Sequence, residues 1–227
     1  MNIALIVFGG TGQRIKSNVP KQFIKINNKE LVAYTIETFE KHPLVDEIVL
    51  ITNSDFLNFT KQLAINYRFL KVRHIISGGK SRQESVRIGL NETSYKDDDN
   101  ILIHDGDRPL VSFEIISQAL KILNTKQACC PIIKKEDELK EVSNLGRKIL
   151  INGESFDVQT PQAFKYKLIK DAHNRLIDKQ FSDDISILEA LDEKVEMFLG
   201  DVYNFKVTLN NDLDYLKELI NKNGKEK

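Results

Sequence analysis

Short apolar runs alternate along the chain with segments whose apolar residues recur every three or four positions. The apolar runs cover residues 3–7, 48–51, 72–76 and 101–103, and the segments with helical spacing include residues 31–39 and 56–67. Runs of this length that are rich in Ile, Val and Leu are typical of buried strands. The alternation therefore predicts an α/β fold, with a Rossmann-like, mostly parallel sheet that has helices on both faces.

The second half of the chain continues this pattern with more interruptions. Strands are expected at residues 128–133, 195–199 and 203–208, and helices at residues 162–173, 185–191 and 211–221. Pro161 precedes the first of these helices, a place that suits proline because the N–H it lacks would have no helical partner. The whole chain, residues 1–227, is expected to form a single domain.

Residues 134–157 break the pattern, because they are charged and poorly periodic. They predict a hairpin arm that leaves the main body. A second copy of the chain is the simplest partner for such an arm, so we expect a homodimer. A solvated excursion without a partner is the alternative.

The charge balance argues against some classes of partner. The sequence has 33 basic and 33 acidic residues, so it carries no bulk field that would attract nucleic acid. Any bound anion should therefore be held by a local cluster of charges. The longest apolar runs are far too short for a membrane span, and we expect a cytoplasmic protein with no membrane partner.

A glycine-rich turn follows the first predicted strand and has the features of a phosphate site. It comprises Phe8, Gly9, Gly10, Thr11 and Gly12, with Arg14 and Lys21 close behind. Glycines let backbone N–H groups approach an anion, and the two cations add charge to the same region. The spacing matches neither a P-loop nor a Rossmann fingerprint. A turn that merely closes a strand–helix junction is the alternative.

A second glycine turn, Gly78-Gly79, opens the helix expected at residues 81–90. Ser81 is a plausible N-cap, and Glu84 stands three residues later as in a capping box. The turn is therefore explained locally as a capped helix. It also predicts a ligand pocket lined by these glycines and Ser85, because ligands bind at the carboxyl edge of open α/β sheets.

Two further positions place charge at this edge. Asp105 ends the predicted strand at residues 101–103 and is a candidate Mg²⁺ ligand, because Mg²⁺ prefers carboxylates together with phosphate oxygens. Arg108 suits a second phosphate, whereas a salt bridge between Asp105 and Arg108 is the alternative. Lys206 interrupts an apolar segment and needs a counter-charge, for which a ligand phosphate is attractive.

Taken in order, these motifs resemble one family, the cytidylyltransferases that act on alditol phosphates. The family includes the 2-C-methyl-D-erythritol 4-phosphate enzyme and the ribitol 5-phosphate enzyme, and the resemblance spans nearly the whole chain. The matching motifs are residues 9–14, 20–23, 78–85, 104–109, 159–164 and 204–208. No single motif is specific, but their order and spacing together identify the family.

The resemblance implies a nucleotidyltransferase fold, Mg²⁺ as cofactor, and attack by an alditol phosphate on the α-phosphorus of CTP. It implies catalytic roles for Arg14, Lys21 and Lys206, and a metal ligand at Asp105. The implied CTP-binding residues are Phe8, Gly9, Gly10, Thr11, Gly12, Gly78, Gly79, Lys80, Arg82, Ser85 and Asp105. The implied alditol-phosphate contacts are Asp105, Arg108, Ser182, Lys206 and Thr208.

Several positions depart from the family pattern. Asn152 replaces an arginine of the arm, for which Arg147 could substitute, and Ser182 replaces a threonine. Asp107 stands where a small or apolar residue is usual, and Tyr203 stands where an acidic residue sometimes occurs. The change at Asn152 puts the acceptor contact from a second subunit in doubt, and Tyr203 means that a second metal carboxylate is missing there.

The opening loop, Gly-Gly-Thr-Gly, resembles that of the ribitol-type enzymes. The changes at Asn152 and Ser182 also touch the alditol side and leave the CTP side largely intact. We therefore expect ribitol 5-phosphate or a related polyol phosphate as acceptor, in cell-wall or capsule synthesis. The alternative is 2-C-methyl-D-erythritol 4-phosphate, in isoprenoid precursor synthesis. Two wider alternatives are a nucleotidyltransferase for another sugar phosphate and a non-catalytic nucleotide-binding protein.

Overall fold

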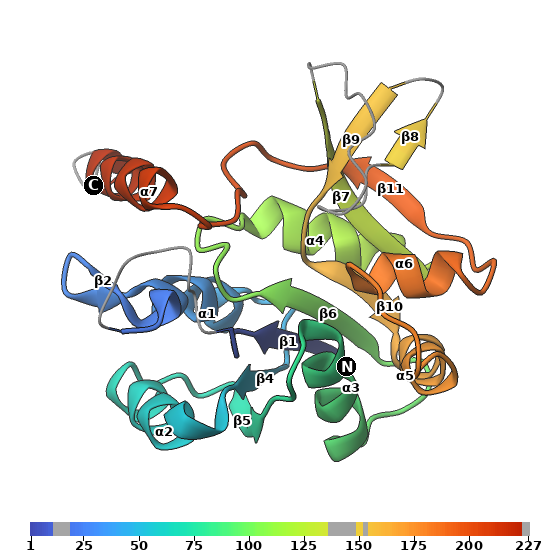
Figure 1. Ribbon diagram of the computed structural model, residues 1–227, viewed down its shortest axis with the longest axis horizontal. Coiled ribbons are helices and arrows are strands. Elements are labelled where there is room, and N and C mark those ends of the chain that lie inside the picture. Colours follow the sequence, from blue (N-terminus) through green and yellow to red (C-terminus); the bar gives the residue numbers. More distant parts are fainter. Residues whose placement is uncertain (11–18, 136–148, 152–153, 224–227) are drawn as a thin grey trace.

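The computed structural model describes residues 1–10, 19–135, 149–151 and 154–223. Its centre is a mixed sheet in the order β5-β4-β1-β6-β10-β7-β9-β8 (Figure 1). Four neighbouring strands are parallel: β5 (Val72–Ser77), β4 (Glu47–Thr52), β1 (Asn2–Val7) and β6 (Asn100–Asp105). The prediction of a mostly parallel α/β sheet is confirmed.

The helix predicted at residues 162–173 is wrong at its start, because it begins only at Tyr166. Residues 162–165 form strand β10 (Gln162–Lys165), which runs antiparallel between β6 and β7 (Ala128–Lys134). Ala163 and Phe164 are fully buried there, and strands on both sides satisfy the backbone. The helix α5 (Tyr166–Arg175) follows, and β11 (Glu196–Leu199) pairs in parallel with β7.

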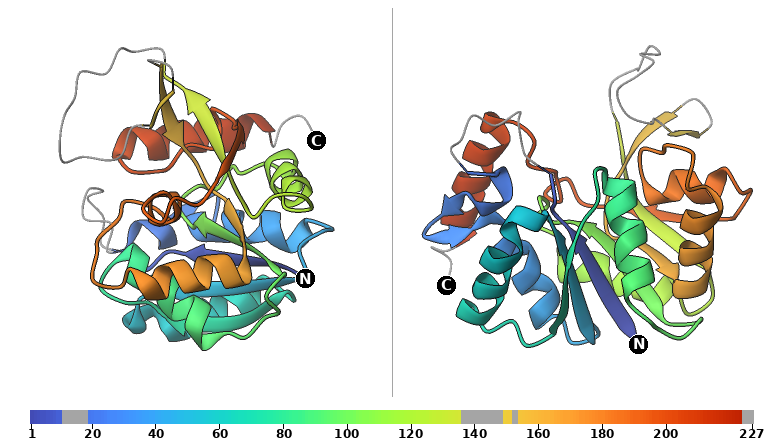
Figure 2. Two further views of the ribbon diagram at one scale, coloured as in Figure 1. Left: turned by 90° about the vertical axis from the view of Figure 1, so that its right-hand side faces the viewer. Right: turned by 60° about the horizontal axis from the view of Figure 1, so that its bottom comes forward.

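Helices cover both faces of the sheet (Figure 2). One face packs against α1 (Leu31–Lys41), α2 (Leu57–Asn66) and α4 (Phe113–Ile122), and the other against α3 (Arg82–Glu92), α5 and α6 (Asp184–Glu189). Strand β1 shows the alternation that this requires. Ala4 and Ile6 contact the first layer, whereas Ile3 and Leu5 contact the second.

The segment between β11 and α7, residues 200–209, crosses the carboxyl edge of the sheet instead of joining it. The strand expected at residues 203–208 is wrong, because this segment has no sheet partner. Val207 is instead fully buried beside helix α7 (Asn210–Asn223) and a small hairpin, β2 (Lys25–Ile26) with β3 (Lys29–Glu30). With Val207 buried against α7, its N–H donates to the Asp107 carbonyl at 2.9 Å, in the loop that follows β6.

The base of the predicted arm stands out from the body (Figures 1 and 2). Strand β9 (Glu154–Val158) pairs antiparallel with β7, and β8 (Ile149–Ile151) pairs with β9. Residues 136–148 and 152–153, with Arg147 and Asn152, lie outside the described residues. The arm's role in a homodimer therefore stays a prediction. Among the described residues, no helix is long and apolar enough to span a membrane.

Candidate active site

A pocket of about 410 Å³ opens at the carboxyl ends of β1 and β6. Its walls come from both glycine turns, the short helix η1 (Lys21–Phe23), the loop after β6, and the segment that crosses the sheet edge. The lining residues are Val7, Phe8, Gly9, Gly10, Lys21, Gln22, Gly79, Lys80, Ser81, Arg82, Ser85, Asp105, Asp107, Lys206 and Thr208. This volume suits a small-molecule site.

The first glycine turn is held by Gln22. Its side-chain amide donates to the carbonyl oxygens of Phe8 at 2.9 Å and Gly10 at 3.0 Å, and Gln22 is only 2% exposed. Because the amide occupies these carbonyls, it fixes the path of the turn where it meets the pocket. Sequence reasoning included Gln22 in a motif but gave it no role; a polar residue between Lys21 and the buried Phe23 was the available signal.

The second glycine turn is both a capped helix and a wall of the pocket. The Ser81 hydroxyl accepts from the Glu84 N–H at 3.1 Å, which confirms the predicted cap. The Ser85 hydroxyl donates to the Ser81 carbonyl at 2.7 Å and accepts from Gly79 N–H at 3.0 Å. A Cβ on Gly78 would lie 2.6 Å from that hydroxyl, so glycine is required for this close approach.

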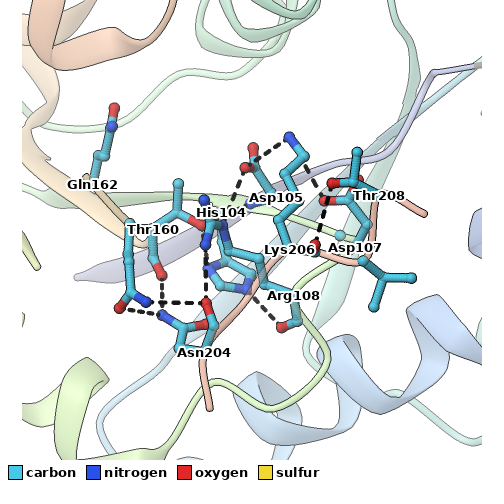
Figure 3. A network of polar contacts seen from close by, with 12 residues as sticks. His104, Asp105, Asp107, Arg108, Thr160, Gln162, Asn204, Lys206 and Thr208 are labelled. Atoms are coloured by element: carbon cyan, nitrogen blue, oxygen red, sulfur yellow. Dashed lines mark hydrogen bonds and ion pairs between the residues drawn. The ribbon is translucent and has the colours of Figure 1, made fainter. Parts of the chain in front are cut away.

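Asp105 lines the pocket and pairs with three cations, Arg82, Arg108 and Lys206; Figure 3 shows the last two. One carboxylate oxygen accepts from Arg82 Nε at 2.8 Å. The other accepts from Lys206 Nζ at 3.1 Å and from Arg108 Nε at 3.3 Å. Burial alone would raise the pKa of Asp105, but the three cations hold it well below its usual range. The salt bridge offered as the alternative for Arg108 is therefore present.

His104 supports Asp105 from behind through Thr160 (Figure 3). The Asp105 N–H donates to the Thr160 hydroxyl oxygen at 3.1 Å, and that oxygen lies 2.9 Å from His104 Nδ1. His104 Nε2 lies 3.2 Å from the Arg108 carbonyl, so Nε2 carries the proton and Nδ1 accepts from the hydroxyl. Burial lowers the pKa of His104 to about 3, and the ring is neutral.

Arg82 links Asp105 in the pocket to Asp184, a buried acid at the start of α6. Its Nη1 donates to Asp184 at 2.8 Å, and Asp184 also accepts from His173 Nε2 at 3.0 Å. Burial opposes the charged forms, yet Arg82 lowers the pKa of Asp184, and the two carboxylates raise the pKa of Arg82. Asp184 was not among the predicted site residues; its neighbour Asp183 caps α6 by accepting from Ser186 N–H at 2.8 Å.

At the mouth of the pocket, Asp107 lies between two lysines. Lys21 forms an ion pair with Asp107 and donates to the Val207 carbonyl at 2.8 Å. Lys206 Nζ lies 3.8 Å from the other oxygen of Asp107 (Figure 3). Asp107 was noted in the sequence only as an unusual residue.

The structure brings most of the sequence-predicted site residues together and separates a few. Phe8, Gly9, Gly10, Lys21, Gly79, Lys80, Arg82, Ser85, Asp105, Lys206 and Thr208 share the pocket. Among the described residues, Gly78 and Arg108 do not line it, and Ser182 lines a separate hollow beside α6. Thr11, Gly12 and Arg14 lie outside the described residues. The roles assigned to all of these residues stay predictions.

Known proteins match this chain over nearly its full length. The family model for 2-C-methyl-D-erythritol 4-phosphate cytidylyltransferase (IspD) matches residues 2–222. The enzyme of that name from Clostridium perfringens is 42% identical, over 93% of this chain and 95% of the relative. The one from Clostridium tetani is 37% identical, over 97% of this chain and 91% of the relative.

Solved structures agree with these relatives. The Francisella tularensis 2-C-methyl-D-erythritol 4-phosphate cytidylyltransferase superposes with a TM-score of 0.77 at 28% identity, over 95% of this chain and 97% of that one. An Anaerococcus prevotii structure, at 24% identity, shares the fold with a TM-score of 0.79, over 97% of this chain and 96% of that one. Fold, sequence and full-length coverage lead to one assignment: the chain belongs to the 2-C-methyl-D-erythritol 4-phosphate cytidylyltransferase family and is a CTP-dependent cytidylyltransferase.

Proposed function

We propose that this chain transfers CMP from CTP to 2-C-methyl-D-erythritol 4-phosphate. A phosphate oxygen of the acceptor attacks the α-phosphorus of CTP, the bond from that phosphorus to the bridging oxygen of the β-phosphate breaks, and pyrophosphate leaves. The main support is full-length identity of 36–42% to enzymes that carry this name. The pocket's lysines and aspartate supply the charges that such a transfer needs.

The expected preference for ribitol 5-phosphate is not supported by these relatives. That preference depended on four letters of the opening loop and on two substitutions, at Asn152 and Ser182. The family match covers residues 2–222 and thus weighs far more positions. It favours the alternative, the methylerythritol phosphate acceptor of isoprenoid precursor synthesis.

The nucleotide side of the pocket is proposed to bind CTP through backbone groups and short side chains. Gly9 and Gly10 from the first turn, and Gly79 and Ser85 from the second, face the same space. The Ser85 hydroxyl donates to Ser81 and accepts from Gly79, so it would read a base with its remaining lone pair, together with backbone groups of the turns. Arg82 already forms ion pairs with two carboxylates. We therefore assign it to holding Asp105 in place beside the nucleotide.

The phosphate side is proposed to stabilise charge as the transfer proceeds. Lys21 and Lys206 both pair with Asp107 at the mouth of the pocket, and Thr208 lines the same pocket. The acceptor is already an anionic phosphate, so no general base is needed to create the nucleophile. Fixed cations that face the developing charge lower the barrier without reorganising.

Asp105 fits a role in holding Mg²⁺. Among the described residues, no group of three His, Cys, Asp or Glu side chains could hold a metal alone. Mg²⁺ instead suits one or two carboxylates together with substrate phosphate oxygens, and the low pKa of Asp105 keeps its carboxylate charged. When bound, the ion would neutralise phosphate charge and polarise the reacting phosphorus. Lys206, at 36% exposed, is the most exposed of the three cations on Asp105.

The proposal is tested by following pyrophosphate release from CTP with a panel of acceptors. The panel contains 2-C-methyl-D-erythritol 4-phosphate, ribitol 5-phosphate, glycerol 3-phosphate and arabinitol phosphate. We expect the first to give a kcat/KM at least about tenfold above the others, because matched polar groups discriminate strongly. A higher value for ribitol 5-phosphate would overturn the proposed acceptor.

The same assay separates the wider alternatives. UTP and GTP replace CTP in parallel reactions, and equal turnover with either would indicate a different nucleotidyltransferase. CTP binding by calorimetry without pyrophosphate release for any acceptor would indicate a non-catalytic binding protein. Omission of Mg²⁺ should abolish turnover, and restoring the ion should restore it.

A further inference from the structure

Asp107 joins three segments that are distant in the sequence. It lies in the loop after β6 and lines the pocket. Its carbonyl oxygen accepts from the Val207 N–H at 2.9 Å, which ties the loop to the segment that crosses the sheet edge. Its carboxylate pairs with Lys21, which belongs to the segment after the first glycine turn. One residue therefore connects both lysine-bearing walls.

The contacts of Lys21 leave part of its ammonium group for a ligand. An ammonium has three donors, and two of them are directed to Asp107 and to the Val207 carbonyl. The side chains of Lys21 and Asp107 are only 12% and 13% exposed, so the pair is fixed at the wall instead of moving in solvent. The third donor is available to a phosphate oxygen in the pocket.

Asp107 also reduces repulsion between the two lysines. Lys206 Nζ lies 3.8 Å from Asp107 Oδ1, while Lys21 binds Oδ2 of the same carboxylate. Two ammonium groups this close to one another repel unless an anion lies between them. Among the described atoms, Asp107 Oδ1 is buried and has no hydrogen-bond partner, so its nearby charge partner is Lys206.

We propose that Asp107 is a positioning residue for cytidylyl transfer. It holds the ammonium of Lys21 against the Val207 carbonyl and lets Lys206 lie beside it, so that both cations are in place before the triphosphate arrives. Asp107 acts through these lysines and does not itself touch the reacting atoms. This inference rests on the proposed function, in which Lys21 contacts the phosphates.

The first test is Asp107→Asn, which keeps the shape of the side chain and removes its charge. We expect kcat to fall by about tenfold to hundredfold, because small displacements of a catalytic group are costly. The KM for CTP should stay equal or decrease, because removing an anion makes the pocket more positive. Asp107→Glu, which restores the charge, should recover part of kcat.

The control is Glu37→Gln. Glu37, on helix α1, pairs with Lys29 of β3 at 2.7 Å and with Lys41 at 3.1 Å, and none of the three lines the pocket among the described residues. This variant removes the same kind of lysine partner elsewhere, so kcat and KM should match the unmodified protein. Thermal melting of all variants checks that each is folded.

A direct readout of Lys21 separates positioning from a general loss of structure. Brief acylation followed by mass spectrometry measures how fast each lysine reacts. Lys21 should react faster in Asp107→Asn, just as Lys29 should in Glu37→Gln. Asp107→Asn with an unchanged kcat, or with a lowered kcat but unchanged Lys21 labelling, would overturn the inference. Full activity of Lys21→Ala would instead contradict the proposed function.

Discussion

Two groups of charges meet at Asp105, and they contrast a fully buried ion pair, Asp184 with His173, with the partly exposed Lys206. The inner cluster consists of Arg82, Asp184 and His173, and the rim cluster of Lys21, Asp107 and Lys206. In the inner cluster, Asp184 and His173 side chains are 1% and 0% exposed and bind each other. In the rim cluster, Lys206 is 36% exposed, and its ammonium has donors to spare.

This difference indicates that the two clusters have different roles, one in stability and the other in turnover. A buried charge whose contacts are all with the protein contributes to shape, and its loss leaves an uncompensated partner. A charge as exposed as that of Lys206 has little effect on folding, but it can act on a ligand in a water-poor pocket. Substitutions in the inner cluster should therefore reduce stability, whereas those in the rim cluster should reduce turnover.

The largest effect is expected from Asp184→Asn. The variant leaves Arg82 with one carboxylate and removes the charged partner of His173. Breaking a buried ion pair from one side typically costs about 3–5 kcal/mol, so the free energy of unfolding should fall by about that amount. Urea unfolding followed by circular dichroism measures it.

Asp183, the residue before Asp184, provides a matched control. Asp183→Asn changes a neighbouring carboxylate whose role is to cap α6, and asparagine caps helices about as well as aspartate. Its unfolding free energy should be nearly unchanged. Equal losses in the two variants would mean that the inner cluster has no special part in stability.

The next largest effect is expected from Lys206→Met, which tests the rim. Losing one fixed cation raises the barrier by about 3 kcal/mol, so kcat should fall at least about a hundredfold. Stability should change little, because Asp105 keeps Arg82 and Arg108 as partners. Steady-state kinetics and urea unfolding on the same preparation measure both. If Lys206→Met instead lowers the unfolding free energy and retains kcat, the role assigned to the rim cluster is wrong.

Much of the fold could be predicted from the sequence because its main strands are continuous apolar runs. Strands β1, β4, β5 and β6 lie within one or two residues of the expected positions. Strand β10 was missed because it has only four residues, Gln162–Lys165, and runs directly into α5. The segment at residues 203–208 was misassigned because its apolar residues pack on α7 instead of a strand.

The site was predictable where it depends on strand ends, and not where it depends on long-range pairs. Glycine turns and Asp105 follow strands in the sequence, and parallel strands end at one edge. Arg82 and Asp184 are 102 positions apart, and His104 and Thr160 are 56 apart. No local pattern relates such residues, so Asp184 was assigned no role in the site, and Thr160 was placed only within the motif at residues 159–164.

The third prediction concerns pH, and it arises from His104 beneath Asp105. Burial lowers the pKa of His104 from 6.5 to about 3. Between these values the unfolded chain binds a proton that the folded chain does not, so stability decreases as pH falls below about 6.5. The carboxylates of Asp105 and Asp184 have lowered pKa values, and their contribution is lost only at more acidic pH.

His104 alone should therefore remove about 2 kcal/mol of unfolding free energy between about pH 7 and about pH 5. His42, whose pKa is also lowered by burial, acts in the same direction, so the unmodified protein should lose more than this. His104→Gln cannot titrate and isolates the difference: its unfolding free energy should vary less with pH than that of the unmodified protein. If the unfolding free energies of the two proteins change equally with pH, His104 becomes protonated in the folded protein. The imidazole beside Asp105 would then carry a charge, as the lysines of the rim cluster do.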